Sequence, residues 1–316
     1  MILCCGEALI DFVPAGDGAC VRPVPGGSIF NVAIGLARLG APAGYFGKLS
    51  TDFFGNFLLQ TLSANGVDTS LALRAPGPTS LAFVDLPASG GSEPRYVFYT
   101  DCAVDRSLRI DELPERLAAS VHALHFGSIS LVLEPCASSL EALLQRESHR
   151  RVISLDPNVR PPLIQDPQAY RSRFEQWTGF ADIIRLSRAD FDWLYPDRPT
   201  GEVFTGWFDR GVSLVILTEG AKGACGMTAQ GATADCPAPA VDVVDTVGAG
   251  DSFLAALLFY LDREGRLRSQ YDLRQVSAES LLQILQFANR AAALTCSRPG
   301  ADPPFLGELE ADPRTR

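Results

Sequence analysis

The stretch "DTVGAGDSF" at residues 245–253 stands between two β-branched residues, Val243 and Val244, and the apolar run "LAALLFYL" at residues 254–261. This pattern predicts a strand end, a tight turn and a buried helix. Glycines let backbone N–H groups face outward, and the positive end of the helix dipole then favours a phosphate or another anion. Asp251 is expected to point into the same place. A carboxylate beside an anion site is electrostatically costly, and the candidate reason for its presence is to take a proton from a hydroxyl that attacks a phosphate. The structural alternative is an ordinary acidic residue in the first turn of a helix.

Short apolar segments alternate with helical patterns along the chain. This alternation predicts an α/β fold, with a mostly parallel sheet covered by helices on both faces. The expected strands are residues 2–6, 123–129, 152–156, 183–187 and 214–218. The expected helices are residues 28–39, 53–65, 137–146 and 277–296. The first of these helices should begin at the cap Ser28 and stop at Gly40, and the last should begin at Ser277.

Two regions interrupt this alternation with turn-linked β segments, at residues 12–24 and 78–100. The second contains a hairpin signal, in which strands 81–86 and 95–100 flank a loop rich in Pro, Gly and Ser. One interpretation is a small β-sheet lid over a site at the edge of the main sheet. The other is a surface hairpin without a functional role, and the pattern alone does not separate the two.

Length, charge and cysteine usage restrict the class of protein. A chain of 316 residues can bury a large core, as one big α/β domain or as two smaller ones. The net charge of −10 and the sequence pI of about 4.8 argue against nucleic acid and anionic membranes as partners. The eight cysteines lack C-x-x-C spacing, and neither a secretory signal nor a membrane-spanning stretch is apparent. We therefore expect a reduced, cytoplasmic protein.

Candidate binding residues follow the expected strands, because ligands of open α/β sheets bind beyond the carboxyl ends of the strands. Asp11 is expected at the end of the first strand, where its carboxylate can accept from two adjacent hydroxyls. Gly27 permits close backbone approach, and Asn31 offers a donor and an acceptor to a polyhydroxylated ligand. The other strand-end candidates are Asp156, Asn158, Ser187, Thr218 and Gly220.

Two basic residues supply positive charge for anionic groups. Arg160 in "LDPNVR" is a candidate to bind the substrate or a transferring phosphate. Lys222 in "LTEGAKGA" is a candidate to bind a nucleotide phosphate or ribose. The sequence contains neither G-x-x-x-x-G-K-[ST] nor a G-x-G-x-x-G that opens a βαβ unit, so P-loop and dinucleotide-binding folds are disfavoured.

These segments together resemble the ribokinase-like sugar kinases of the PfkB family. "GGSIFNVAIGLARLG" at residues 26–40 is similar to the N-terminal signature of the family, and "DTVGAGDSF" is similar to its C-terminal one. The resemblance covers essentially the whole chain. It implies one ribokinase-like kinase domain over residues 1–316, with a large α/β part and a small β-sheet lid. It also implies ATP-dependent phosphorylation of a sugar hydroxymethyl group, and homodimers that pair through their lids.

The resemblance further implies roles for individual residues. Asp251 would be the catalytic base, and the backbone of Gly248, Ala249, Gly250 and Asp251 would form the anion hole. The residues implied to hold the sugar are Asp11, Gly27 and Asn31, with Phe98 touching it from the lid. The residues implied for the ATP site are Thr218, Gly220 and Asn289, with Ser187 and Lys222 near them. The backbone carbonyls implied to bind a monovalent cation such as K⁺ lie near Asp245, Val247 and Gly300.

Within the family, "GEALIDF" and "YVFYTDCAVDRSL" look most like fructokinases, so the expected reaction converts fructose to fructose 6-phosphate. Thr100 stands where 2-keto-3-deoxygluconate kinases and some fructokinases carry Arg, which disfavours an acidic sugar. "SRAD" at residues 187–190 stands where many relatives have Asn-x-x-Glu near magnesium. Asp190 is therefore a candidate ligand for Mg²⁺, with a side chain shorter than the Glu of those relatives. The alternatives are kinases for 2-keto-3-deoxygluconate, ribose or a nucleoside, and a catalytically silent sugar-binding regulator with the same fold.

Overall fold

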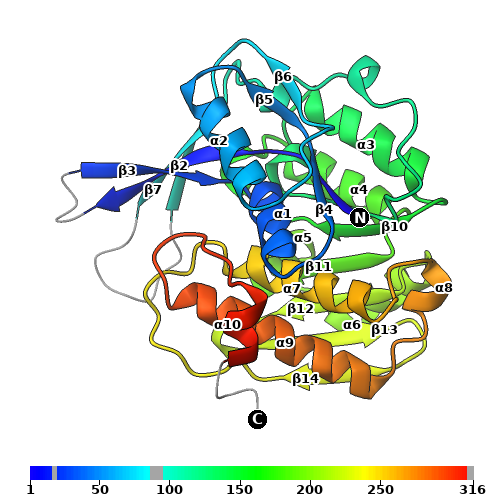
Figure 1. The fold of residues 1–316 in the computed structure, drawn as a ribbon. Coiled ribbons are helices and arrows are strands. Elements are labelled where there is room, and N and C mark those ends of the chain that lie inside the picture. The colour runs from blue at the N-terminus through cyan, green and yellow to red at the C-terminus, as the bar shows by residue number, and fades with distance from the viewer. Residues whose placement is uncertain (16–19, 86–94, 312–316) are drawn as a thin grey trace.

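The computed structural model describes residues 1–15, 20–85 and 95–311. An eight-stranded sheet runs through the molecule in the order β14-β13-β12-β11-β10-β9-β1-β4 (Figure 1). Its parallel strands are β1 (Ile2–Cys5), β4 (Ala43–Phe46), β9 (Ala123–Gly127), β10 (Val152–Asp156), β11 (Ile183–Ser187) and β12 (Leu214–Thr218). Two antiparallel strands, β13 (Ala224–Thr228) and β14 (Thr233–Cys236), extend one edge.

The parallel strands are apolar along most of their length, as a sheet buried on both faces requires. The segment "LVILT" of β12, for example, is buried at every position. The register aligns the carboxyl ends of neighbouring strands, since Gly127 pairs with Asp156 and Ser187 pairs with Thr218. Polar residues that follow these strands therefore gather at one edge of the sheet.

Helices cover both faces of the sheet and bury apolar side chains against it. On one face lie α1 (Ser28–Arg38), α2 (Phe53–Ala64), α7 (Ala249–Arg263), α8 (Gln270–Leu273), α9 (Ala278–Cys296) and α10 (Leu306–Ala311). On the other lie α3 (Cys136–Glu147), α4 (Pro167–Thr178), α5 (Arg188–Leu194) and α6 (Thr200–Asp209). The remaining short elements are β5 (Lys48–Ser50), β6 (Leu73–Ala75) and the 3₁₀ turns η1 (Asp105–Ser107), η2 (Ile110–Glu112), η3 (Ser128–Leu131), η4 (Pro161–Leu163) and η5 (Gly220–Lys222). Among the described residues, no helix is both long and apolar enough to cross a membrane.

A second, four-stranded sheet projects from the side of the molecule, and we call it the lid sheet (Figure 1, left). Its strands, in spatial order, are β3 (Cys20–Gly26), β2 (Leu9–Ala15), β7 (Leu81–Asp85) and β8 (Arg95–Tyr99). The predicted hairpin is confirmed, because β7 and β8 pair in antiparallel fashion, while its loop at 86–94 lies outside the described residues. The large sheet, its helices and this small sheet together confirm the predicted fold class.

Three local predictions are wrong. Asp11 does not end the first strand but lies inside β2, because the chain leaves β1 at Cys5 and enters the lid sheet. Val243 and Val244 form no strand; they are exposed in the connection after β14, which shows that β-branched residues indicate a strand only where a partner is present. Ser28 is not the cap of α1, because Gly27 occupies the N-cap position.

The predicted ends of two helices are confirmed. Gly40 follows the C-terminus of α1 with φ of 92°, a left-handed conformation that favours glycine. Ser277 caps α9, since its hydroxyl accepts from the backbone N–H of Ser280 at 3.1 Å.

Candidate active site

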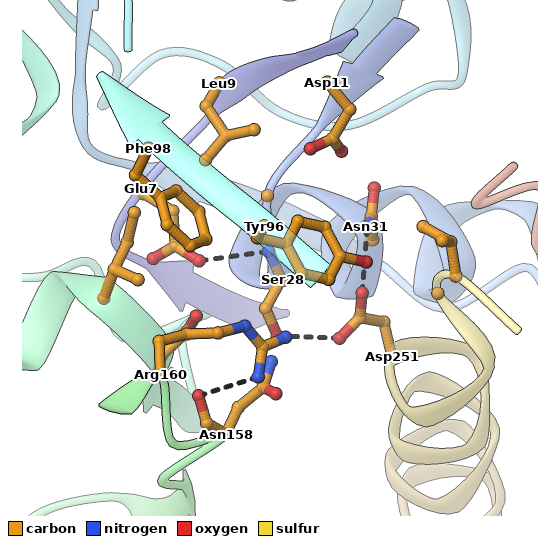
Figure 2. Close-up of a pocket in the computed structure, with 15 residues that line it drawn as sticks. Glu7, Leu9, Asp11, Ser28, Asn31, Tyr96, Phe98, Asn158, Arg160 and Asp251 are labelled. Atoms are coloured by element: carbon orange, nitrogen blue, oxygen red, sulfur yellow. Dashed lines mark hydrogen bonds between the residues drawn. The ribbon is translucent and has the colours of Figure 1, made fainter. Parts of the chain in front are cut away.

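A cavity lies between the lid sheet, the carboxyl edge of the large sheet and the first turns of α1 and α7 (Figure 2). It encloses about 430 Å³, part of which is open to solvent. Seven of the predicted catalytic and substrate-binding residues line it: Asp11, Gly27, Asn31, Phe98, Arg160, Gly248 and Asp251. The other lining residues are Glu7, Leu9, Ser28, Tyr96, Ser128, Ile129, Asn158 and Val247. The fold thus brings together residues that are far apart in the chain.

Helix α7 begins in the predicted Gly-Ala-Gly turn. Gly248 occupies the N-cap position with φ of 75°, and a Cβ there would lie 2.5 Å from the Cβ of Ala301. The helix has no side-chain cap, so N–H groups of its first turn remain available to an anion. Asp251 lies in this turn, but its carboxylate is bonded to side chains of α1 rather than to its own helix (Figure 2).

The carboxylate of Asp251 is buried and held by two donors. The hydroxyl of Ser28 donates to Oδ1 at 2.7 Å, and Nδ2 of Asn31 donates to Oδ2 at 2.8 Å. Burial raises the pKa of Asp251, and the hydrogen bonds from Asn31 and Ser28 oppose this change. Each carboxylate oxygen keeps a further lone pair for a ligand hydroxyl. This arrangement suits a proton acceptor better than a residue that only begins its helix.

Glu7, absent from the predicted site, stabilises the start of α1. Its Oε1 accepts from the backbone N–H of Ser28 at 3.0 Å, and the hydroxyl of Ser130 donates to its Oε2. Glu7 replaces a side-chain cap, because the N-cap residue Gly27 has none. Burial raises the pKa of Glu7, and its hydrogen bonds, first of all that from Ser130, lower it. The available signal was a charged residue within the mostly apolar stretch "GEALIDF".

The lid sheet places Asp11, Tyr96 and Phe98 at the cavity (Figure 2). Gly26 on β3 leaves room for Asp11 on β2, because a Cβ at Gly26 would collide with Oδ2 of Asp11. Burial and, second, the charge of Asp251 raise the pKa of Asp11 to about 7. The rings of Tyr96 and Phe98 stack with their centroids 5.8 Å apart. The lid sheet therefore offers a ligand both a hydrogen-bond acceptor and an aromatic wall.

Arg160 is the only guanidinium among the described residues that line this cavity. Its Cζ lies 5.7 Å from the ring centroid of Tyr96, and its Nη1 donates to the carbonyls of Asn158 and Val159, both at 3.2 Å. These contacts hold its positive charge near Asp251, whose pKa it lowers. The position fits the predicted contact with a substrate or with a transferring phosphate.

The residues predicted for the ATP site lie outside this cavity, and the side chains of two of them are hydrogen-bonded to other residues of the protein. The hydroxyl of Thr218 accepts from Arg185 at 2.6 Å. The side-chain amide of Asn289 donates to the carbonyl of Cys236 at 3.0 Å. Gly220 and Lys222 belong to the exposed turn η5, which directly follows β12.

Arg185, also absent from the predicted site, is a buried cation beside the first turn of α7. Its Nη1 donates to Asp156 at 2.7 Å, while its Nη2 makes the bond to Thr218. A Cβ at Gly250 would lie 3.1 Å from the guanidinium nitrogens, so the second glycine of the turn accommodates this charge. The signal was a charged residue inside the apolar strand "IIRLS".

Asp190 does not present a free carboxylate to a metal. Its Oδ1 accepts from the N–H of Val159 at 2.7 Å, and its Oδ2 accepts from the N–H and the hydroxyl of Ser187 at 3.0 and 2.6 Å. Ser187 in return caps α5. Within the described ranges there is also no group of three or more His, Cys, Asp or Glu side chains that could hold a metal ion. The residues present therefore form no ready Mg²⁺ site around Asp190.

The three residues predicted for a monovalent cation do lie together. Oδ1 of Asp245 accepts from the N–H of Val247 at 3.0 Å, and Oδ2 accepts from the N–H of Gly300 at 2.7 Å. These bonds join the turn before α7 to the loop after α9. Cation binding by the carbonyls of this turn and loop stays a prediction.

Comparisons with known proteins give a consistent result. Residues 1–306 match the family described as pfkB family carbohydrate kinase. A fructokinase from Rhizobium leguminosarum bv. trifolii is 41% identical over 270 residues, which cover 84% of this chain and 81% of the relative. The structure of fructokinase with bound ATP from Xylella fastidiosa is similar with a TM-score of 0.89 and 28% identity, over 98% of this chain and 97% of that one. A fructokinase double mutant from Vibrio cholerae O395, in a form with bound fructose, ADP and potassium, has a TM-score of 0.84 and 28% identity over the same shares.

Proposed function

The chain belongs to the pfkB family of carbohydrate kinases, and from this premise we propose that it transfers the γ-phosphate of ATP to fructose, giving fructose 6-phosphate. The observation that carries the proposal is the position of Asp251, whose carboxylate faces the cavity from the first turn of an uncapped helix. The N–H groups of that turn suit the phosphoryl oxygens. The fructokinases among the relatives support fructose as the acceptor.

Asp251 accepts the proton of the attacking hydroxyl in this mechanism. The hydroxyl oxygen forms a bond to the γ-phosphorus, and the bond between that phosphorus and the oxygen of the leaving ADP breaks. The backbone from Gly248 to Asp251 stabilises the negative charge of the transferring group. Burial favours this role of Asp251, because a desolvated carboxylate binds a proton more readily.

The charges around the cavity favour a neutral sugar over a sugar acid. Three carboxylates line it, those of Glu7, Asp11 and Asp251, against the guanidinium of Arg160. A sugar carboxylate would meet net negative charge there, which disfavours 2-keto-3-deoxygluconate. Thr100 is buried and does not line the cavity, so it offers no compensation. Ribose or nucleoside kinases and a silent regulator are not favoured either, given fructokinase relatives and an intact Asp251 turn.

We place ATP along turn η5, near Thr218, Gly220, Lys222 and Asn289, with its phosphates directed toward α7. Because both carboxylate oxygens of Asp190 accept hydrogen bonds from Val159 and Ser187, we propose that Mg²⁺ is held chiefly by nucleotide phosphates and water. We also propose a monovalent cation such as K⁺ at the backbone near Asp245, Val247 and Gly300. The potassium-bound form of the Vibrio cholerae relative supports this assignment.

The outer face of the lid sheet suits a second copy of the chain. Side chains alternate along β8, so Tyr96 and Phe98 face the cavity while Val97 and Tyr99 face away. Phe83 on β7 pairs with Val97 and therefore lies on the same outer face. The exposed fractions are 37% for Phe83, 56% for Val97 and 61% for Tyr99. Covering this apolar face stabilises a lid-to-lid homodimer. Sedimentation of a Val97→Asp variant as a monomer, against a dimeric parent, is the expected result.

We further propose that residues 1–316 act as one kinase domain in the cytoplasm. All eight cysteines carry free thiols, as expected of a protein in a reducing compartment.

A coupled assay of ADP release over a panel of acceptors tests the function. The panel contains fructose, ribose, 2-keto-3-deoxygluconate and a nucleoside. We expect the highest kcat/KM for fructose, with phosphate on its 6-hydroxymethyl group by NMR of the product. A higher kcat/KM for another acceptor would overturn the substrate assignment. Binding of fructose without any sugar-dependent ADP release would instead support the regulator.

A further inference from the structure

A hydrogen bond between Ser28 and Asp251 joins the starts of two helices (Figure 2). Ser28 is the first residue of α1 and is buried, and its hydroxyl donates to Oδ1 of Asp251 at 2.7 Å. Asn31, three residues further along the same helix face, donates to Oδ2 at 2.8 Å. One face of α1 therefore orients both oxygens of Asp251.

Ser28 is itself held from the opposite side. Its backbone N–H donates to Oε1 of Glu7 at 3.0 Å. The hydroxyl of Ser130 donates to the other oxygen of Glu7 and accepts from the backbone N–H of Glu7 at 2.7 Å. A continuous set of hydrogen bonds thus runs from Ser130 through Glu7 and Ser28 to Asp251. The bond to Glu7 fixes the backbone of Ser28 at the start of α1, from which its hydroxyl reaches the carboxylate of Asp251.

We propose that Ser28 is a positioning residue, which holds Asp251 in its proton-accepting orientation and keeps it ionised until the sugar hydroxyl arrives. The inference rests on the proposed function, because it deepens the role of Asp251. An ionised carboxylate oxygen can only accept, so the Ser28 hydroxyl must be the donor in this bond. Without it, a buried negative charge loses one of its two donors, and Asp251 takes up a proton more easily.

Other charged groups also act on Asp251. Asp11 lies opposite it in the lid sheet, Asp156 ends β10, Arg160 follows β10, and Arg185 lies on β11. A substitution of Ser28 changes none of these charges. A shift in the titration of Asp251 between parent and variant can therefore be attributed to the lost hydroxyl.

The first test is the pH profile of kcat for Ser28→Ala at saturating fructose and ATP, where the effect of Asp11 on sugar affinity does not enter. We expect its acidic limb to move upward by about one pH unit. The loss of a hydrogen bond to an ionised group raises the pKa of a carboxyl by roughly this amount. At pH values below the limb, kcat is then about tenfold lower than in the parent, and above it little changes. Ser28→Thr retains the hydroxyl and should return the limb to the position of the parent. Ser28→Cys, a weaker donor, should give a smaller shift in the same direction.

Ser252→Ala is the matched control. Ser252 is a buried serine next to Asp251, but its hydroxyl accepts from Thr295 at 2.8 Å and makes no hydrogen bond to the carboxylate. We expect its acidic limb to coincide with that of the parent. A uniform loss of activity in Ser28→Ala at every pH, with an unmoved limb, would overturn the proposal.

A second measurement separates this inference from the proposed function. In protein with ¹³C-labelled aspartate, the carboxyl signal of Asp251 is the one that disappears in Asp251→Asn, and its titration reports the pKa without turnover. A higher pKa in Ser28→Ala supports the positioning role, and an equal pKa overturns it. Absence of sugar phosphorylation by the parent would count against the proposed function alone.

Discussion

The two sides proposed for the site, one for the sugar and one for the nucleotide, use their polar groups in different ways. On the sugar side, Asp11, Asn31 and Asp251 line a cavity while acceptor positions remain open to a ligand. On the nucleotide side, the hydroxyl of Thr218 already accepts a hydrogen bond from Arg185, and Lys222 is exposed.

The difference follows from how each side is enclosed. The lid sheet, α1 and α7 surround the sugar side, so its carboxylates are buried before a ligand binds and their pKa values rise. Of the residues proposed for the nucleotide side, Gly220 and Lys222 lie on an exposed turn, Ser187 and Thr218 end strands, and Asn289 lies inside α9. We therefore expect substitutions on the sugar side to lower kcat or the specificity for the sugar, and substitutions on the nucleotide side to raise KM for ATP. Four predictions test this division.

Asp251→Asn should have the largest effect. The substitution keeps the size of the side chain but removes the proton acceptor, and kcat should fall by at least ~10², within the range for a lost general base. The affinity for ATP should stay similar or increase slightly, because a negative charge beside the γ-phosphate is gone. Steady-state kinetics and a calorimetric titration with ATP measure both quantities.

Asp262→Asn is the control for that experiment. Asp262 lies near the other end of α7, where it pairs with His122 at 2.7 Å, and it lies outside the cavity. Its kcat should stay within about twofold of the parent, since proton transfer in the site is unaffected. If kcat of Asp251→Asn stayed within a few-fold of the parent value, Asp251 would be an ordinary acidic residue of the first helical turn. The expectation that substitutions on the sugar side lower kcat would then be contradicted.

Arg160→Gln should have the next largest effect. Loss of a charged donor in the cavity should lower kcat/KM for fructose by about 10- to 100-fold, as expected for a hydrogen bond to or from an ionised group. KM for ATP should change much less. Arg171→Gln is the matched control, because Arg171 also lies over an aromatic ring, that of Trp193, and donates to a carbonyl, but lies outside the cavity. Equal losses in the two variants would indicate a structural rather than a substrate-binding role.

The affinity for fructose should depend on pH through Asp11. The pKa of this carboxyl is raised to about 7, so it is mostly protonated at pH 6 and mostly ionised at pH 8. Only the ionised form accepts from two sugar hydroxyls, so the affinity should increase by about tenfold between these pH values. Calorimetry with fructose gives the dissociation constants. Asp11→Asn should weaken binding and flatten this dependence, and an unchanged slope in that variant would assign the titration to another group.

Lys222→Ala should have the smallest effect. Lys222 is exposed, and an exposed charge interaction of about 0.2–1 kcal/mol corresponds to an increase of KM for ATP of about 1.5- to 5-fold. KM for fructose and kcat should stay at the parent values, and Lys222→Arg should behave like the parent. If Lys222→Ala raised both KM values equally, the two sides would not be separable as described.

Local patterns in the sequence were sufficient for the elements that carry the site. The Gly-Ala-Gly turn before an apolar run predicted the start of α7, since only a few backbone conformations join a turn to a helix and glycine permits them. Short apolar runs predicted five strands of the large sheet within two residues at each end, because a strand buried on both faces has to be apolar throughout. The catalytic candidate Asp251 and the turn proposed to bind an anion are contiguous, so one segment contains both.

Contacts between distant segments were decided only by the tertiary structure. Asp11 proved to be a lid residue, and Ser28 a partner of Asp251 rather than a helix cap. Glu7 and Arg185 owe their roles to partners from other parts of the chain, Ser28 for the first and Asp156 and Thr218 for the second. The physical reason is that hydrogen bonds and burial depend on which segments meet in space. Periodicity along the chain predicts which side of an element is apolar, but it does not predict which polar group lies opposite on the neighbouring element.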